Sequence, residues 1–147
     1  MNYIKLTNLN LKTFTEQDAL DYCLLNNLNP DNINELWLQD NKLTDISGIK
    51  LFKNIEYLWL SNNEIEDILV LKNLNNLKIL YIDNNKIKDI SVIQYLNNLG
   101  NLGIENLELE SDQIKYIKNL KKLEDLYYIN GFKDISVLKQ LNKNIKL

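Results

Sequence analysis

Residues 32–53 of the chain read NINELWLQDNKLTDISGIKLFK, and residues 54–75 and 76–97 repeat the pattern without a gap as NIEYLWLSNNEIEDILVLKNLN and NLKILYIDNNKIKDISVIQYLN. Each 22-residue block has apolar residues at positions 2, 5, 7, 12, 15, 18 and 21, an asparagine at position 10 and an aspartate at position 14. A repeat of this length is typical of proteins that stack one supersecondary unit per repeat.

Within each block, two different spacings of apolar residues follow one another. In residues 35–39, apolar and polar side chains alternate, which predicts a strand. The spacing of three among Ile46, Ile49 and Phe52 predicts a short 3-10 or helical turn. One such unit cannot bury its apolar face alone, so we expect the units to stack into a parallel sheet with one continuous core.

The pattern L-x-x-L-x-L-x-x-N-x-[LI] at residues 33–43, 55–65 and 77–87 resembles the leucine-rich repeat signature, with Ile accepted for the first and third Leu. The Asp-Ile-Ser sequences that start at positions 45, 89 and 134 are similar to those of the 22-residue subclass found in internalin-like proteins and protein phosphatase regulatory subunits. The resemblance implies an α/β solenoid with a curved parallel β-sheet on its concave face. It also implies short 3-10 or helical turns on the convex face and a helical N-terminal cap, but it does not identify a function.

The predicted organisation has three parts. Residues 1–31 are expected to form the helical cap, because Thr15 and Asp18 are spaced as in a capping box and apolar residues follow at helical spacing. These apolar residues are Ala19, Leu20, Cys23, Leu24 and Leu28. Five repeats are then predicted over residues 32–53, 54–75, 76–97, 98–121 and 122–142, followed by a C-terminal stub or cap over residues 143–147.

The recurring polar residues have predicted structural roles. Asn41, Asn63 and Asn85 are expected to pair with backbone groups at the turn after each strand. Four aspartates are expected to cap the following helical turns. They are Asp45, Asp67, Asp89 and Asp134.

Two further segments lie at or beyond the degenerate repeats. Residues 111–122 predict an inserted helix with a solvated lysine face. Residues 144–147 begin what resembles another strand, and nearby lysines are expected to discourage pairing at that edge.

The composition disfavours catalysis and binding to polyanions. All 17 basic residues are Lys, the chain has no Arg and no His, and 20 acidic residues give a net charge of −3. Histidine is the commonest general base and a common zinc ligand, and arginine is the usual bidentate reader of phosphate and guanine. We therefore expect a protein that is not an enzyme and that binds no cofactor, no metal ion and no nucleic acid.

No disulfide or targeting segment is predicted. The single cysteine, Cys23, cannot form an internal disulfide and is expected to pack within the cap helix. The sequence shows no secretory leader and no run long enough to span a membrane. We expect a soluble cytoplasmic protein that does not bind membranes, or a secreted one if a native leader has been removed.

The candidate binding residues lie at positions 4, 6 and 8 of the blocks, which are expected to point outward from the concave sheet. Position 6 gathers both tryptophans of the chain and two tyrosines into one column. Together with acidic neighbours, these rings suit a protein partner with a basic and apolar surface. The predicted partner-binding residues are Glu35, Trp37, Gln39, Tyr57, Trp59, Ser61, Ile79, Tyr81, Asp83, Glu105 and Tyr127.

The leading functional hypothesis is a non-enzymatic module that masks or scaffolds a protein partner, as an inhibitor, an immunity protein or an effector would. Three alternatives stay open. The ring column could merely stabilise the sheet. It could bind a glycan, although a strand separation of ~4.8 Å is too small for one sugar per ring. The chain could also self-associate through the concave patch or the C-terminal edge, but a homo-oligomer is not favoured.

Overall fold

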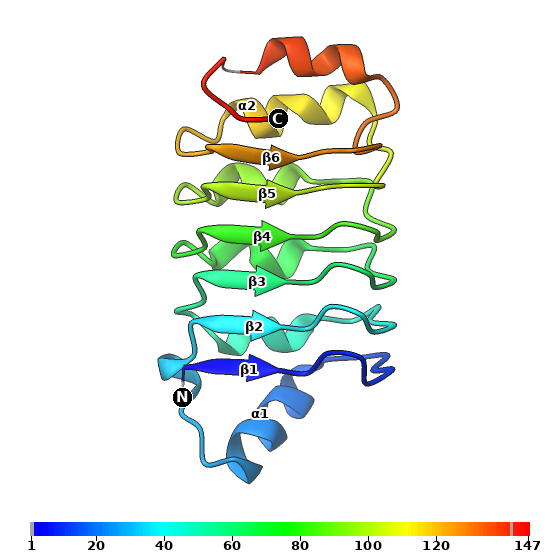
Figure 1. Cartoon of the computed structure of the whole chain (residues 1–147). Coiled ribbons are helices and arrows are strands. Elements are labelled where there is room, and N and C mark those ends of the chain that lie inside the picture. The colour runs from blue at the N-terminus through cyan, green and yellow to red at the C-terminus, as the bar shows by residue number, and fades with distance from the viewer. Residues whose placement is uncertain (1, 142) are drawn as a thin grey trace.

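A computed structural model describes residues 2–141 and 143–147. Met1, where the predicted cap begins, and Asn142, where the predicted fifth repeat ends, lie outside the described residues. Six short strands form one sheet in the order in which they occur in the sequence, and every neighbouring pair is parallel (Figure 1). The strands are β1 (Tyr3–Lys5), β2 (Glu35–Trp37), β3 (Tyr57–Trp59), β4 (Ile79–Tyr81), β5 (Asn101–Gly103) and β6 (Asp125–Tyr127). This open parallel stack confirms the predicted solenoid.

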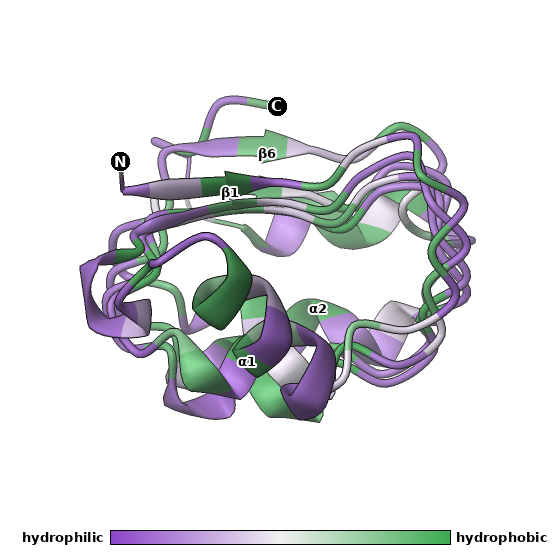
Figure 2. Ribbon diagram, turned by 90° about the horizontal axis from the view of Figure 1, so that it is seen from below, coloured by the Kyte–Doolittle hydropathy of each residue, from purple (hydrophilic) through white to green (hydrophobic). Residues whose placement is uncertain are grey.

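Helical segments form the second layer, opposite the sheet (Figure 2). Two are α-helices, α1 (Glu16–Leu25) and α2 (Ile114–Lys118). The others are 3-10 turns: η1 (Pro30–Asn32), η2 (Ser47–Leu51), η3 (Leu69–Asn73), η4 (Ser91–Tyr95), η5 (Ser111–Gln113) and η6 (Ile135–Gln140). Each coil of the chain thus consists of one strand and one return through the helical layer, as the two spacings predict.

The core runs between the two layers along the whole stack. In the three regular blocks, all seven recurring apolar positions are buried, and none of these side chains is more than 3% exposed. The predicted helix α2 also buries Ile114 and Ile117, while Lys115 and Lys118 stay exposed. Burial of apolar surface stabilises by about 25 cal/mol per Å². Because each coil contributes only one layer of this surface, its stability depends on its neighbours.

A buried asparagine links each regular coil to the next. Asn63 accepts a hydrogen bond from the Leu43 N–H at 2.9 Å. Its amide group donates to the carbonyl oxygens of Leu38 at 3.0 Å and Leu60 at 2.9 Å. Asn85 makes the same three bonds one coil further on. These bonds confirm the predicted role, since they satisfy backbone groups that the turn leaves unpaired.

A second polar column, which was not predicted from the sequence, lies one residue before the recurring asparagine position of each coil. Its members have positive φ angles between 52° and 60°, a region that Asn and Asp adopt more readily than other residues with a Cβ. They are Asn8, Asp40, Asn62, Asn84, Asn106 and Asn130. Side-chain hydrogen bonds join Asn62 to Asp40 at 2.7 Å, Asn106 to Asn84 at 2.7 Å and Asn130 to Asn106 at 3.0 Å. This column turns the chain out of each strand.

The recurring aspartates bind the first N–H groups of the helical turns, but only Asp134 occupies the predicted N-cap position. Asp45, Asp67, Asp89 and Asp134 each accept a hydrogen bond from the N–H two residues further along the chain, at 2.7–2.9 Å. The first three lie one residue before the N-cap position of their turn, and Asp134 is itself the N-cap of η6. Side-chain oxygens thus satisfy N–H groups that a helical start leaves without partners.

The N-terminal segment contains the predicted helix and also a strand that was not predicted. The helix α1 begins with a capping box, in which the Thr15 hydroxyl accepts from the Asp18 N–H and the Asp18 carboxylate accepts from the Thr15 N–H. The hydrogen bonds that the Thr15 N–H and hydroxyl donate to the Asp18 carboxylate lower the pKa of Asp18. Preceding the helix, β1 pairs with β2 and extends the sheet by one strand.

The helix α1 uses only part of its apolar surface to cover the core. Ala19 and the predicted core residue Cys23 are buried, but Leu20 and Leu24 are 43% and 81% exposed. Only part of the apolar residues at helical spacing therefore packs against the core. The side facing the core carries small residues, and Gly48 in η2 brings the backbones close enough for its N–H to donate to the Phe14 carbonyl oxygen at 2.7 Å.

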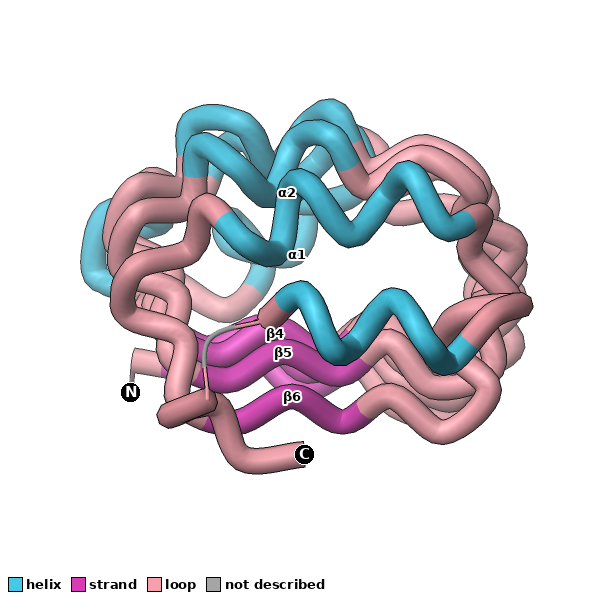
Figure 3. Tube along the Cα trace, turned by 90° about the horizontal axis from the view of Figure 1, so that it is seen from above, coloured by secondary structure: helices cyan, strands magenta, loops and turns pink. Residues whose placement is uncertain are grey.

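The C-terminal end is closed by the last segment of the chain. The Leu126 N–H donates to the Lys146 carbonyl oxygen at 2.9 Å, and the Lys146 N–H donates to the Glu124 carbonyl oxygen at 2.7 Å. The strand-like start predicted at residues 144–147 is thus a single β-bridge beside β6. Viewed from this end, η6 lies across the stack between the sheet and the other helical turns (Figure 3), where Val137 and Leu138 are buried.

We expect Asn63→Ala to lower the free energy of unfolding by about 2 to 4 kcal/mol, because three buried backbone groups lose their partner. Urea denaturation measures this as a lower transition midpoint. Asn73→Ala, at an exposed position in η3, is the matched control and should change stability by no more than about 0.5 kcal/mol. Equal stability of both variants would contradict the role assigned to the buried asparagines.

We expect Gly48→Ala to destabilise the N-terminal end by about 1 to 3 kcal/mol, because a Cβ there would lie 2.7 Å from the Phe14 carbonyl oxygen and closer still to that of Thr15. The displaced helix should expose the buried Cys23 thiol, which a thiol-labelling rate measures. Gly100→Ala is the control, since its Cβ would make ordinary 3.7 Å contacts. Similar labelling rates in the two variants would disprove this explanation.

Candidate protein-binding face

The outer face of the sheet carries an aromatic column, defined as Trp37, Trp59, Tyr81 and Tyr127. The strand register places Trp37 beside Trp59 and Trp59 beside Tyr81, so the predicted alignment of position 6 is confirmed. The two indole rings lie with centroids 4.6 Å apart and planes tilted by 41°. Parallel strands in register thus bring residues 22 positions apart into ring contact.

A glycine lets the two tyrosines of the column meet. Gly103 occupies the strand between them, and the rings of Tyr81 and Tyr127 nevertheless lie only 5.7 Å apart. A Cβ on Gly103 would overlap the Tyr81 ring and lie 2.7 Å from the Asp83 carboxylate oxygens. Partial burial, together with the neighbouring Tyr127, raises the pKa of Tyr81 to about 12. The Tyr81 phenol therefore stays neutral, and able to donate a hydrogen bond, even in moderately alkaline solution.

The tryptophan half of the column is held by its surroundings. The Trp37 indole N–H donates to the Glu35 carboxylate at 3.1 Å, and the Lys5 ammonium lies 4.8 Å from the Trp37 ring centroid. Tyr57 stacks against Trp59 with centroids 6.3 Å apart. Tyr127 is 45% exposed, whereas the rings of Trp37, Tyr57, Trp59 and Tyr81 are half-buried. Rings that already contact one another lose less side-chain freedom when a partner binds.

Asp83 and Ser61, both predicted to bind a partner, are hydrogen-bonded to each other within the sheet. Asp83 is 9% exposed, and its carboxylate accepts from the Ser61 hydroxyl and from the Glu105 N–H, both at 2.8 Å. The side-chain carbonyl oxygen of Gln39 is buried and has no hydrogen-bond partner within residues 2–141 and 143–147. The Glu105 side chain is partly exposed and borders the column.

The structure adds residues to this face that the prediction omitted. Because β1 belongs to the sheet, Tyr3 and Lys5 continue the columns of Glu35 and Trp37. In the sequence, inward Ile4 and Leu6 alternate with outward Tyr3 and Lys5, but these four residues are too few to identify a strand by periodicity. At the other end, Asp125 accepts from the Asn101 side-chain amide at 2.9 Å and extends the acidic border.

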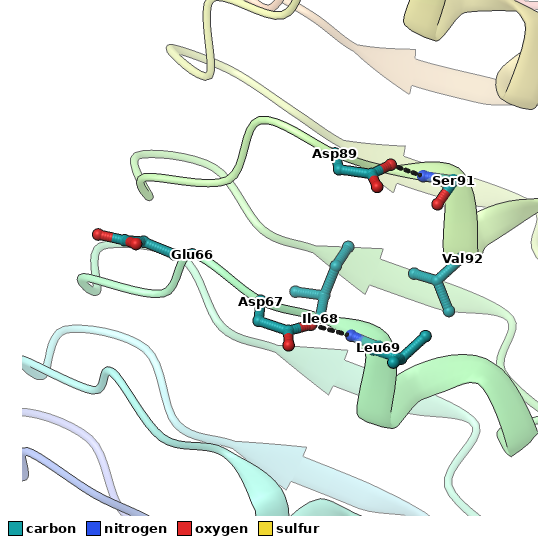
Figure 4. A pocket seen from close by; sticks show the side chains of 7 residues that line it. All are labelled: Glu66, Asp67, Ile68, Leu69, Asp89, Ser91 and Val92. Carbon is teal, nitrogen blue, oxygen red and sulfur yellow. Dashed lines mark hydrogen bonds between the residues drawn. The ribbon is translucent and has the colours of Figure 1, made fainter.

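Two carboxylates that line one hollow on the helical side are engaged by backbone N–H groups. Figure 4 shows this hollow between two coils, where the Asp67 and Asp89 carboxylates already accept hydrogen bonds from the Leu69 and Ser91 N–H groups. Across residues 2–141 and 143–147, no group of three or more Cys, Asp or Glu side chains is placed to share a metal ion. No helix in this same part of the chain has the length and apolarity needed to cross a membrane.

Comparisons with known proteins agree with this architecture. The family described as "Leucine Rich repeats (2 copies)" matches residues 31–73 and 53–143. The chain is similar to internalin F from Listeria monocytogenes strain 4b F2365, with 30% identity, a TM-score of 0.69, and coverage of 79% of this chain and 34% of that one. The chain thus spans about a third of that protein's solved length. No curated protein matches the sequence.

Two further solved structures are similar. Internalin C2 from the same Listeria strain has 28% identity and a TM-score of 0.65, with 98% of this chain and 68% of that chain covered. The leucine-rich repeat domain of APL1B has 15% identity and a TM-score of 0.69 over 85% of this chain and 35% of that one, which shows the shared fold alone. A strand, a buried asparagine and a helical turn recur along the stack, and the family match runs through the same residues. The chain therefore belongs to the leucine-rich repeat family and has internalin-like repeats.

Proposed function

We propose that the chain is a non-enzymatic module whose aromatic column binds a protein partner with an apolar and basic surface, and so masks or scaffolds that partner. Proteins of this family generally mediate protein–protein interactions. The observation that carries the proposal is the pair of ring contacts, Trp37 with Trp59 and Tyr81 with Tyr127, on the open face of the sheet. Aromatic residues are the commonest energetic anchors of protein interfaces.

The acidic border supports a partner with Lys or Arg side chains. Glu35, Glu105 and Asp125 flank the column, so a cation between them would interact with both carboxylates and ring faces. The chain's own Lys5 shows this geometry, because its ammonium lies over the Trp37 ring. An apolar side chain beside the cation would complete the contact with the tryptophan half.

The ring spacing favours a protein over a glycan. With centroids 4.6 Å apart, Trp37 and Trp59 form one continuous apolar surface rather than two separate sugar platforms. Ring packing also stabilises the sheet, by about 0.5 to 1.5 kcal/mol per pair. Stabilisation alone would be served equally well by fully covered rings, whereas these stay partly exposed.

We expect Trp37→Ala/Trp59→Ala to weaken partner capture from extracts of the native cell at least tenfold, a loss of about 1.4 kcal/mol or more. The specific partner is the protein that wild type and the control variant Tyr95→Ala retain but the double variant loses. Tyr95 is a suitable control because it is a 45% exposed aromatic residue in η4, on the helical side. Equal capture by all three proteins would refute the proposed face.

A fluorescence titration then separates protein from glycan binding. Trp37 and Trp59 are the only tryptophans of the chain, so their emission reports directly on the column. We expect no change with a panel of glycans and a saturable change with the captured partner. The opposite result would replace the protein partner with a glycan.

We expect Glu35→Gln/Glu105→Gln to slow association with the captured partner about threefold to tenfold and to weaken its dependence on salt. Glutamine keeps an oxygen that can accept from the Trp37 indole N–H, so the ring should stay in place. Glu66→Gln/Asp112→Asn makes the same change in net charge away from the sheet face and serves as the control. Surface plasmon resonance at several salt concentrations measures both rates, and identical behaviour of the two variants would argue against a basic partner surface.

A further inference from the structure

Within residues 2–141 and 143–147, no segment pairs with the outer edge of β1, and the strand pairs with β2 on its other side. In and around β1, the even-numbered residues direct their backbone N–H and C=O groups toward β2. The Leu6 N–H, for example, donates to the Trp37 carbonyl oxygen at 2.8 Å. In a parallel ladder, Tyr3, Lys5 and Thr7 therefore direct their backbone N–H and C=O groups outward. Figure 2, which views the molecule from this end, shows no helix or loop across β1.

An apolar groove lies beside this edge, between the loop that follows β1 and the helix α1. Its apolar lining consists of Leu6, Leu9, Leu11, Phe14, Tyr22 and Leu25. Leu9 and Leu25 are 54% and 84% exposed, so a large apolar surface stays in contact with solvent. The helix covers the core through Ala19 and Cys23, and the groove is the part of this end that it leaves open.

The opposite end of the sheet shows what a covered edge looks like in this protein. There, backbone hydrogen bonds of Lys146 occupy the outer edge of β6. The Lys146 ammonium also lies 3.8 Å from the Asp125 carboxylate. A short extended segment thus completes the sheet at one end, while β1 has no such neighbour among the described residues.

We propose that the β1 edge and its groove bind an extended segment of a protein partner, which adds to the six-stranded sheet as one further strand. In strand addition, main-chain hydrogen bonds provide affinity and alternate side chains provide specificity. The strands of this sheet turn an aliphatic residue inward at their centre, as Leu36 and Leu58 do. A segment with aliphatic residues at alternate positions would extend the core onto Leu6 and Leu25.

Charged side chains near the β1 edge favour particular residues at the other positions of the partner segment. Lys5 and Lys12 are exposed beside the edge and the groove. Asp18 and Asp21, on the α1 side, already accept hydrogen bonds from neighbours within the helical segment. These donors are neutral, so Asp18 and Asp21 keep their negative charge on the groove side. Lys5 lies on the outer face of the sheet, over the Trp37 ring, and an acidic side chain opposite it on the added strand would complement its charge. The segment is thus apolar on its inner side and acidic on its outer side.

The shape of this end favours a single segment over a second copy of the chain. The helix α1 projects beyond β1 along the direction of the stack (Figure 1). Two copies that brought their β1 strands to pairing distance would bring their α1 helices together first. An isolated extended segment can lie beside β1 without meeting this obstacle.

The test uses the whole chain and a synthetic peptide of sequence Ser-Leu-Glu-Leu-Glu-Leu-Ser as the probe. We expect saturable binding by fluorescence anisotropy, together with slower hydrogen exchange at the amides of Tyr3, Lys5 and Thr7. A peptide methylated at the backbone nitrogens that face β1 should not bind. A peptide with Lys in place of Glu should bind at least tenfold more weakly, and Lys5→Glu should reverse that preference.

Matched variants locate the site. Leu25→Glu should weaken peptide binding at least tenfold, whereas Leu69→Glu should leave it unchanged, because Leu69 is 63% exposed in η3 on the helical side. Circular dichroism should be unchanged in both, since both side chains are exposed. Trp37→Ala/Trp59→Ala should retain the peptide, which separates this site from the aromatic column.

Three results would overturn the proposal. The first is no binding of the peptide at millimolar concentration. The second is equal binding by Leu25→Glu and Leu69→Glu. The third is a dimer, seen by sedimentation, that Leu25→Glu abolishes, together with no protection of the β1 amides by the peptide. The groove would then bind a second copy of the chain.

Discussion

The whole structure depends on hydrogen bonds between backbone groups of one coil and those of the next. No coil has a core of its own, and the turn that follows each strand leaves backbone donors and acceptors inside the stack. Asn63 and Asn85 satisfy these groups from the neighbouring coil, where both side chains are at least nine-tenths buried. Because an unsatisfied buried polar group is costly, this exchange holds successive coils in one register.

That constant register is also what creates the candidate binding face. When coils repeat without a shift, residues at the same position of successive blocks lie side by side on the sheet. Trp37 and Trp59 contact each other for this reason, although neither is needed for the core. The buried side of each strand serves stability, and its outer side is available for recognition, so the two roles can vary independently.

The two ends of the stack are the places where the period stops and other contacts take over. At the N-terminal end, Gly48 allows α1 to approach the first regular coil, and β1 adds an edge strand. At the C-terminal end, η6 and the backbone of Lys146 cover the last coil. An interrupted solenoid must protect its open core and its sheet edges, and this chain does so more completely at the C-terminal end than at the N-terminal end.

The sequence alone determined the strand positions, the buried residues of the regular blocks and the alignment of the aromatic column, because all of these follow from one period. Only the tertiary structure decided that Tyr81 contacts Tyr127 across Gly103 and that β1 joins the sheet. It also decided that the Asp83 carboxylate accepts hydrogen bonds from Ser61 and the Glu105 N–H. These features depend on side-chain directions across neighbouring coils, and on a strand too short to be recognised by periodicity. Spacing along the chain specifies which residues share a face, but the packing between coils specifies which of them remain available to a partner.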